Sequence, residues 1–291
     1  MKFHFAFWAA ILVLSLTAVG LCIRILATNG ISLSESLMLR GASCLLLVFI
    51  FAHLKSHSLK PKALKTQFFR ALIAGLALSF FSLSYKWLTA SAVAVISNID
   101  VPLLIVLGPI IGVATSVRAR VLAVFSILCL VWYVTGIESQ SNLVLGIGVL
   151  LVACFLLCLG YLFIKKSMNE ENEAITILTP ALAIIAYGIV ERILMPAVAQ
   201  AWTPGLFIID IISGFGMFGC YIATMKLYGL ADLATAEFPT LIASLVIQPL
   251  EAIFLNESMK PTYVWSSLAF VFISFYILKW QNQETEVLHA N

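Results

Sequence analysis

Charged residues are scarce in this chain. Only 11% of its 291 residues are Asp, Glu, Lys or Arg, whereas 62% are hydrophobic and the mean hydropathy is +1.06. Soluble domains carry about 25% charged residues, so a soluble catalytic domain, a disordered tail and a nucleic-acid-binding surface are excluded. A net charge of +3 is also too small to indicate a polyanionic partner. The composition predicts an integral membrane protein whose main partner is the lipid bilayer.

Several chemical signatures are missing as well. The sequence has no phosphate-binding loop of the Walker type, so ATP is not expected to drive its activity directly. The four histidines lie at the ends of the chain or of an expected span, or in expected loops, which excludes a histidine proton relay at mid-membrane. All six cysteines lie within apolar runs, where thiols behave as small hydrophobic groups. We therefore expect no disulfide, no metal site and no cofactor.

The sequence contains ten apolar segments long enough to cross a membrane, which requires about 20 mostly apolar residues. The first segment is expected to be retained, because its apolar stretch is too long for a cleaved secretory signal. The ten expected spans are Phe5–Leu26, Leu33–His53, Phe69–Leu88, Ser91–Val113, Val121–Gly136, Val144–Ile164, Ile175–Pro196, Leu206–Met225, Ala234–Leu255 and Tyr263–Trp280.

The basic residues are distributed unevenly between the two sides of the membrane. Ten spans place both termini on one side, and 12 of the 17 basic residues fall there. Because basic loops stay in the cytoplasm, we expect cytoplasmic termini, with a bacterial inner (plasma) membrane as the location. The 12 residues are Lys2, Lys55, Lys60, Lys62, Lys65, Arg70, Arg118, Arg120, Lys165, Lys166, Lys226 and Lys279.

The two halves of the chain resemble each other weakly. Leu88–Ala94 matches Leu230–Ala236, in each case a leucine with alanines four and six residues later. An odd number of spans in each half forces the halves into opposite orientations, as in secondary transporters built from inverted repeats. We therefore expect an all-α integral membrane protein with ten transmembrane helices in two inverted five-helix repeats, residues 1–137 and 138–291.

Three segments carry a resemblance to a known family. Ser34–Ser36 leads into Arg40 of the second span, Tyr85–Pro102 joins the third and fourth spans, and Ile253–Glu257 closes the ninth. Over essentially its whole length the chain resembles the EamA-type transporters of the drug/metabolite transporter superfamily. The resemblance implies a secondary transporter with a central cavity and peripheral fifth and tenth helices, and these two spans are apolar nearly all round. One departure is that the first half has no acidic residue near Thr115.

Polar side chains form stripes along two of the expected spans. Two prolines interrupt the ninth span and free backbone carbonyls, which is tolerated only where a helix lines protein or a cavity. Two interpretations remain open for such stripes, namely hydrogen bonding between helices and the lining of a pathway. Within each stripe the residues are three or four positions apart, which places them on one face of a helix. The stripe of the ninth span is Glu237, Thr240, Ser244, Gln248 and Glu251, and that of the third span is Gly75, Ser79, Ser82, Lys86 and Thr89.

Charged side chains in the hydrocarbon core cost about 2.5–3.5 kcal/mol each, so they normally face a bundle interior or a water-filled cavity. Four bases and four acids fall in one leaflet, which predicts a paired network around an aqueous vestibule: Arg24, Arg40, Lys86 and Arg192 with Asp100, Glu191, Asp210 and Glu251. The residues expected to bind substrate or line its pathway are Arg40, Ser82, Lys86, Asn98, Asp100, Glu191, Asp210, Ser244, Gln248 and Glu251. If protons are coupled, Asp100, Glu237 or Glu251 must carry them.

One glycine-rich segment resembles a nucleotide-binding motif. Gly214–Gly219 matches the pattern G-x-G-x-x-G, but it lies midway through an apolar span and no strand precedes it. We interpret these glycines as positions where helices approach closely or hinge.

The mixture of buried charges indicates the class of substrate. We expect a secondary transporter that moves a small polar or zwitterionic organic metabolite, such as an amino acid or a nucleotide-derived compound, by alternating access. Arg40 or Lys86 would then meet its anionic group. Two other functions remain open, a membrane enzyme that modifies lipid and a channel or sensor, and so does assembly into a homodimer. The enzyme would need a cluster of nucleophilic or metal-binding residues, and the expected spans contain none.

Overall fold

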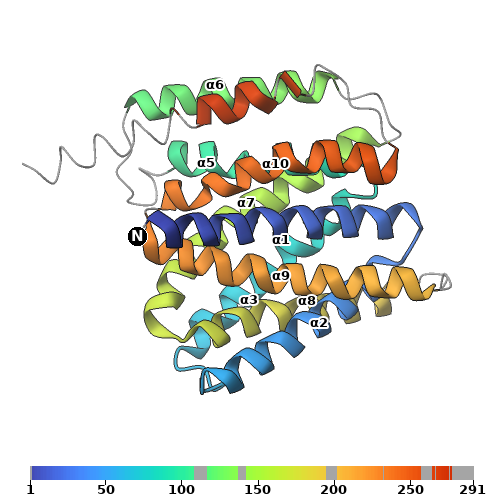
Figure 1. Cartoon of the computed structure of the whole chain (residues 1–291), viewed down its shortest axis with the longest axis vertical. Coiled ribbons are helices and arrows are strands. Elements are labelled where there is room, and N and C mark those ends of the chain that lie inside the picture. The colour runs from blue at the N-terminus through green and yellow to red at the C-terminus, as the bar shows by residue number, and fades with distance from the viewer. Residues whose placement is uncertain are drawn as a thin grey trace, which may run out of the picture.

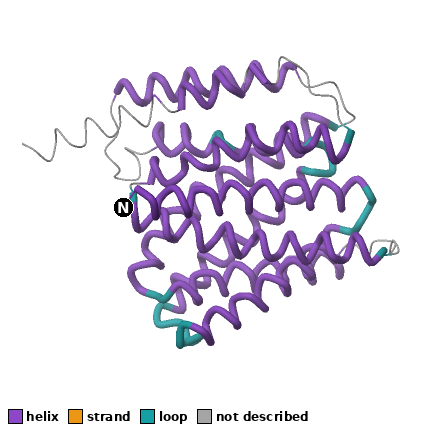
Figure 2. Tube along the Cα trace, in the orientation of Figure 1, coloured by secondary structure: helices purple, strands orange, loops and turns teal. Residues whose placement is uncertain are grey.

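The computed structural model describes residues 2–107, 117–136, 142–194, 202–231, 233–256, 264–265, 267–274 and 276. Within these ranges the chain forms helices joined by short loops, without a strand (Figure 2). Short helical stretches lie between residues 264 and 276. The bounded helices are α1 (Lys2–Thr28), α2 (Leu33–Leu54), α3 (Leu64–Ser84), α4 (Ala90–Ser97), α5 (Asp100–Leu107), α6 (Val117–Gly136), α7 (Leu143–Glu170), α8 (Glu173–Leu194), α9 (Pro204–Leu230) and α10 (Leu233–Leu255).

Seven helices in the described part of the chain are long and apolar enough to cross a membrane. They are α1, α2, α3, α7, α8, α9 and α10. Their backbone hydrogen bonds are made within each helix, as a hydrocarbon environment requires. These are the features of an integral membrane protein.

Successive long helices run in opposite directions (Figure 1). We call the face at which α1, α3, α8 and α10 begin the N-terminal face. The other face, at which α2, α4, α7 and α9 begin, is called the opposite face.

The fourth span is divided into two helices. The sequence predicts one continuous span over Ser91–Val113, and this is wrong, since α4 ends at Ser97 and α5 begins at Asp100. Pro102 explains the break, because proline has no N–H to donate to the carbonyl of Asn98, four residues earlier, and its ring clashes with that carbonyl. Residues 108–113 of the expected span lie outside the described ranges.

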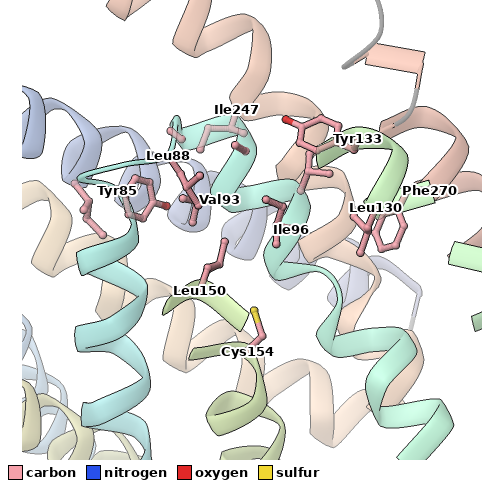
Figure 3. Close-up of a cluster of buried hydrophobic side chains, with 14 of the residues drawn as sticks. Tyr85, Leu88, Val93, Ile96, Leu130, Tyr133, Leu150, Cys154, Ile247 and Phe270 are labelled. Carbon is pink, nitrogen blue, oxygen red and sulfur yellow. The ribbon is translucent and has the colours of Figure 1, made fainter. Parts of the chain in front are cut away.

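Helices from the two halves of the sequence pack against each other throughout the bundle. The main pairs are α1 with α9, α2 with α8, and α3 with α7 and α8. One buried apolar cluster joins the turn before α4 to helices far away in sequence, and Figure 3 shows Tyr85 and Leu88 beside Ile247 of α10 and Leu150 of α7. The halves therefore share one interior.

The helix α6 lies at one edge of the bundle with the helical stretch near residue 270 (Figure 1). Its exposed side chains include Val124 and Phe125, whereas Ala123, Ser126 and Tyr133 are buried. The resemblance implies peripheral fifth and tenth helices, and α6 is peripheral in the described structure. One face of α6 is exposed, and the other packs against α5 and the stretch near residue 270.

The glycines of α9 allow close contact with α1 and α2. A Cβ added at Gly214 would lie 2.6 Å from the backbone oxygen of Arg40, and one at Gly219 would lie 2.3 Å from Oγ of Ser15. At Gly214 no side chain larger than hydrogen fits without moving the backbone of α2, and at Gly219 the side chain of Ser15 would have to move. The interpretation of the G-x-G-x-x-G segment as a packing motif is therefore supported by the geometry of this interface.

The change Gly214→Ala is expected to lower the free energy of unfolding by about 1–3 kcal/mol, the usual cost of overpacking a well-filled interior. Gly229→Ala is the matched control in the same helix, because a Cβ there meets nothing within 4 Å. The control should be neutral or slightly stabilising, since alanine is the better helix former. Thermal unfolding of both variants in detergent tests this, and equal stability of the two would contradict the packing role.

Candidate functional site

A cavity of about 220 Å³ lies inside the bundle, and every bounded helix except α6 contributes to its wall. Most of the lining side chains are apolar. Of the residues predicted from the sequence, five line it: Arg40, Ser82, Asn98, Asp100 and Ser244. The volume is below the range of about 300–1,000 Å³ that is usual for drug-sized ligands. The space therefore suits a small metabolite.

Three polar side chains of the cavity wall have no hydrogen-bond partner among the described residues. They are Thr17, Asn98 and Tyr221, through Oγ1, Nδ2 and the phenolic oxygen respectively. Buried polar atoms are nearly always hydrogen-bonded to protein or to ordered water. Such atoms in a cavity wall are available to a ligand or to water.

Arg40 is held between three helices at the cavity wall. Its guanidinium donates to Oγ of Ser82 at 2.9 Å and to Oγ of Ser36 at 2.8 Å, and Ser36 donates to Asp210 at 3.1 Å. Arg40 and Asp210 also form an ion pair at 3.7 Å, with side chains only 4% and 0% exposed. The predicted pairing of these charges is therefore present, and the charge of Arg40 is compensated within the protein.

Glu251 holds the N-terminus of α4 instead of lining the cavity. Its carboxylate accepts hydrogen bonds from the backbone N–H groups of Ala90 and Ser91, the latter at 2.7 Å. Thr89 accepts a third, from the N–H of Ala92. The first N–H groups of a helix have no partner within it, so Glu251 satisfies two of them inside the bundle and also lies at the positive end of the helix dipole.

The remaining predicted residues are distributed away from the cavity. Lys86 is exposed and Glu191 is half-buried, and neither belongs to the cavity wall. Gln248 is buried but donates to Ser267 at 2.7 Å, which turns its amide toward the stretch near residue 270. The side chain of Glu237 lies outside the described part of the structure. The polar stripe of the ninth span thus divides into two cavity residues, Thr240 and Ser244, and two residues with structural contacts, Gln248 and Glu251.

An ion pair near the opposite face involves a carboxylate that the sequence does not single out as a site residue. Glu35 lies 3.4 Å from the guanidinium of Arg192 and accepts a hydrogen bond from the indole of Trp202 at 2.9 Å. Arg192, one of the four bases of the predicted network, therefore pairs with an acid from the first turn of α2, which is outside the four predicted acids. A carboxylate there is favoured by the helix dipole.

The break between α4 and α5 is covered by thiols of α7. Cys154 donates to the carbonyl of Ser97, and Cys158 donates to the carbonyl of Asp100, each at 3.7 Å. These carbonyls belong to residues that line the cavity. The spacing of four between the cysteines therefore matches the break in the neighbouring helix.

Arg70 is a cavity residue that the sequence interpretation counts only among the basic residues of the cytoplasmic side. The structure corrects this, because Arg70 is 1% exposed and lines the cavity. It donates to the carbonyl of Thr176 at 2.5 Å and to Oγ1 of Thr179 at 3.2 Å, both on α8. Pro180 lies four residues after Thr176 and has no N–H for that carbonyl. Pro180, within the expected seventh span, is thus the feature of the sequence that indicates a carbonyl in need of a donor from another helix.

Comparison with known proteins identifies the fold but no family. No family model matches the chain, and no curated protein matches it. Among solved structures 25 chains match. One of them, described only as the crystal structure of a protein, superposes with a TM-score of 0.70 at 12% identity, over 96% of this chain and 98% of that one. Identity this low shows a shared fold and leaves function to the site itself.

Proposed function

We propose that this chain is a secondary transporter of the EamA type that moves a small polar or zwitterionic organic metabolite by alternating access. The observation that carries the proposal is the cavity between helices of both halves, at the point where the fourth span breaks. Transporters place their substrate sites at discontinuous helices near mid-membrane, where freed backbone groups face a cavity. Asn98 and Asp100 stand at such a break and line the cavity.

The packing of the helices supports two inverted repeats, residues 1–137 and 138–291. Exchange of the halves relates α1, α2 and α3 to α7, α8 and α9, and α4 with α5 to α10. Under this exchange the pair α1–α9 becomes α7–α3, α3–α8 becomes α9–α2, and α2–α8 becomes itself, and each of these pairs of helices is in contact in the bundle. Equivalent contacts at both faces are what alternating access requires.

Two buried charges also occupy equivalent positions under this exchange. Arg70 and Asp210 each lie six residues after the first residue of their helices, α3 and α9. Their partners Thr176 and Ser36 each lie three residues after the first residue of α8 and α2. One polar contact between the halves therefore lies toward the N-terminal face and its counterpart toward the opposite face. Such contacts would form and break in turn as each side opens.

The proposal includes an orientation and an energy source. The distribution of basic residues in the loops supports cytoplasmic termini, and the proposed location is a bacterial inner membrane. Asp100 is the carboxylate expected to couple protons, since it lines the cavity and Glu251 does not. A rate of uptake that does not depend on a pH gradient would instead indicate exchange or facilitated diffusion.

A metabolite screen by thermal shift, followed by uptake into proteoliposomes, tests the transport proposal. A ligand that binds the folded protein raises its apparent stability by mass action, and uptake of such a ligand should be saturable. Asp100→Asn should lower uptake roughly tenfold or more, because a hydrogen bond to a charged group contributes about 1.5–3 kcal/mol. Glu170→Gln, at the end of α7 and outside the cavity wall, is the control. Flux without saturation would indicate a channel, and a product formed from lipid would indicate an enzyme.

A further inference from the structure

Arg70 carries a charge that the described protein does not balance. Its guanidinium is buried in the bundle and contributes to the cavity wall. Its acceptors are all neutral, namely Oε1 of Gln67 at 3.3 Å, Oγ1 of Thr179 at 3.2 Å and the carbonyl of Thr176. Within the described ranges it forms no ion pair with a carboxylate, in contrast to Arg40. A buried guanidinium without a counter-charge is strongly unfavourable in a membrane interior.

Two hydrogen-bonding groups at Arg70 and the nearby Tyr221 have no partner among the described residues. A guanidinium has five N–H groups, and Nε of Arg70 has no partner among the described residues. The hydroxyl of Tyr221 is also without a described partner, lines the same cavity and lies near enough to Arg70 to interact electrostatically. A planar carboxylate is the group that matches a guanidinium fork best, since it accepts two parallel hydrogen bonds.

The side chains in the rest of the cavity wall indicate the chemical nature of the remainder of the ligand. On the helices nearest to Arg70 the wall continues with Ala74, Leu78 and Ile184, all apolar. An inorganic anion would leave these side chains facing an empty space or water. An organic acid with an apolar body would cover them and compensate the charge at once.

We propose that Arg70 binds the carboxylate of a small organic acid with an apolar body, and that Tyr221 donates a further hydrogen bond to it. The assignment rests on the proposed function, because it names the substrate class for that same cavity. It replaces Arg40 and Lys86 as the anion receptor, since Arg40 is neutralised by Asp210 and Lys86 lies outside the cavity wall.

Matched ligands test this assignment without any mutation. The members of each set share one apolar body: leucine, 4-methylpentanoate and 3-methylbutylamine in the first, and phenylalanine, 3-phenylpropanoate and 2-phenylethylamine in the second. Thermal stability of the purified full chain is measured against each compound, with sodium chloride and inorganic phosphate as controls. The acids of at least one set should stabilise the protein and the amine of that set should not. Equal stabilisation by the amines, or by the inorganic anions, would overturn the proposal.

Variants of Arg70 provide the second test. Arg70→Gln should weaken binding of the stabilising acids about 10- to 100-fold, as expected for a lost hydrogen bond to a charged group, and Arg70→Lys should give an intermediate loss. Lys65→Gln removes the same charge from the exposed side of the same helix and should leave binding unchanged. If no acid of either set binds in an Arg70-dependent manner, the proposal is wrong.

Uptake measurements separate this proposal from the transport function. Acids that bind through Arg70 but never cross the proteoliposome membrane would contradict the transporter and leave the carboxylate site in place. Uptake of the amines alone, unaffected by Arg70→Gln, would leave the transporter in place and remove the carboxylate site.

Discussion

Asp210→Asn is expected to lower the free energy of unfolding by about 3–5 kcal/mol, because it leaves the buried charge of Arg40 without compensation. The substitution is nearly isosteric, so the loss reports the charge and not a cavity. Asp210 is completely buried and its Oδ1 receives both Ser36 and the ion pair with Arg40. The measurement is reversible unfolding in mixed micelles, followed by circular dichroism.

A double-mutant cycle shows whether the pair itself is responsible. Adding Arg40→Met to Asp210→Asn removes the uncompensated charge, so the double variant should recover most of the lost stability. Glu173→Gln is the control, because Glu173 and Lys226 form an ion pair whose side chains are 33% and 37% exposed. Exposed pairs contribute about 0–1 kcal/mol. A double variant that loses the sum of the two single losses would contradict this account.

The second large effect is expected at Glu251. Glu251→Ala removes the acceptors of two buried N–H groups at the start of α4, each costing about 1–3 kcal/mol when left unsatisfied, so the free energy of unfolding should fall by about 2–6 kcal/mol. Glu251→Gln retains one acceptor oxygen and should lose less. Thr89→Ala, which removes the neighbouring cap bond to Ala92, should cost about 0.5–2 kcal/mol.

The outcome at Glu251 also decides between two roles. If Glu251 is a structural cap of α4, the free energy of unfolding should fall from the wild type to Glu251→Gln and further to Glu251→Ala. A proton carrier predicts instead that Glu251→Gln is as stable as the wild type while pH-driven uptake is lost. Full stability of the alanine variant would show that the N-terminus of α4 does not depend on this carboxylate.

Helix positions were predictable wherever polar loops mark the ends of an apolar run. The expected spans Leu33–His53 and Ala234–Leu255 agree with α2 and α10 to within one residue at each end. The third span was placed too late, at Phe69 in place of Leu64, because Lys65 and Gln67 look like loop residues by hydropathy. Gln67 and Arg70 lie inside the bundle and share hydrogen bonds with Thr179 of α8, which is far away in the sequence: Thr179 donates to Gln67 and accepts from Arg70.

The candidate site was predictable only in part, for a geometric reason. Spacing identifies a helix face but not the direction in which that face points. On α3 the cavity face runs through Arg70, Ala74, Leu78 and Ser82, whereas the predicted stripe from Gly75 shares only Ser82 with it. Gly75 packs against Tyr187 of α8 instead. A rotation of one residue position, about 100° on a helix, separates the two faces.

The thiols at the broken fourth span give the protein a vibrational reporter of its own. The S–H stretch of cysteine absorbs where other protein groups are silent in the infrared, and its frequency falls as the donated hydrogen bond strengthens. Cys154 and Cys158 donate to carbonyls on the two sides of the break. If α4 and α5 move apart or straighten when ligand enters, the two bands shift independently. Movement at the break between α4 and α5 can therefore be followed in the unlabelled wild-type chain. The variants Cys154→Ala and Cys158→Ala would assign each band.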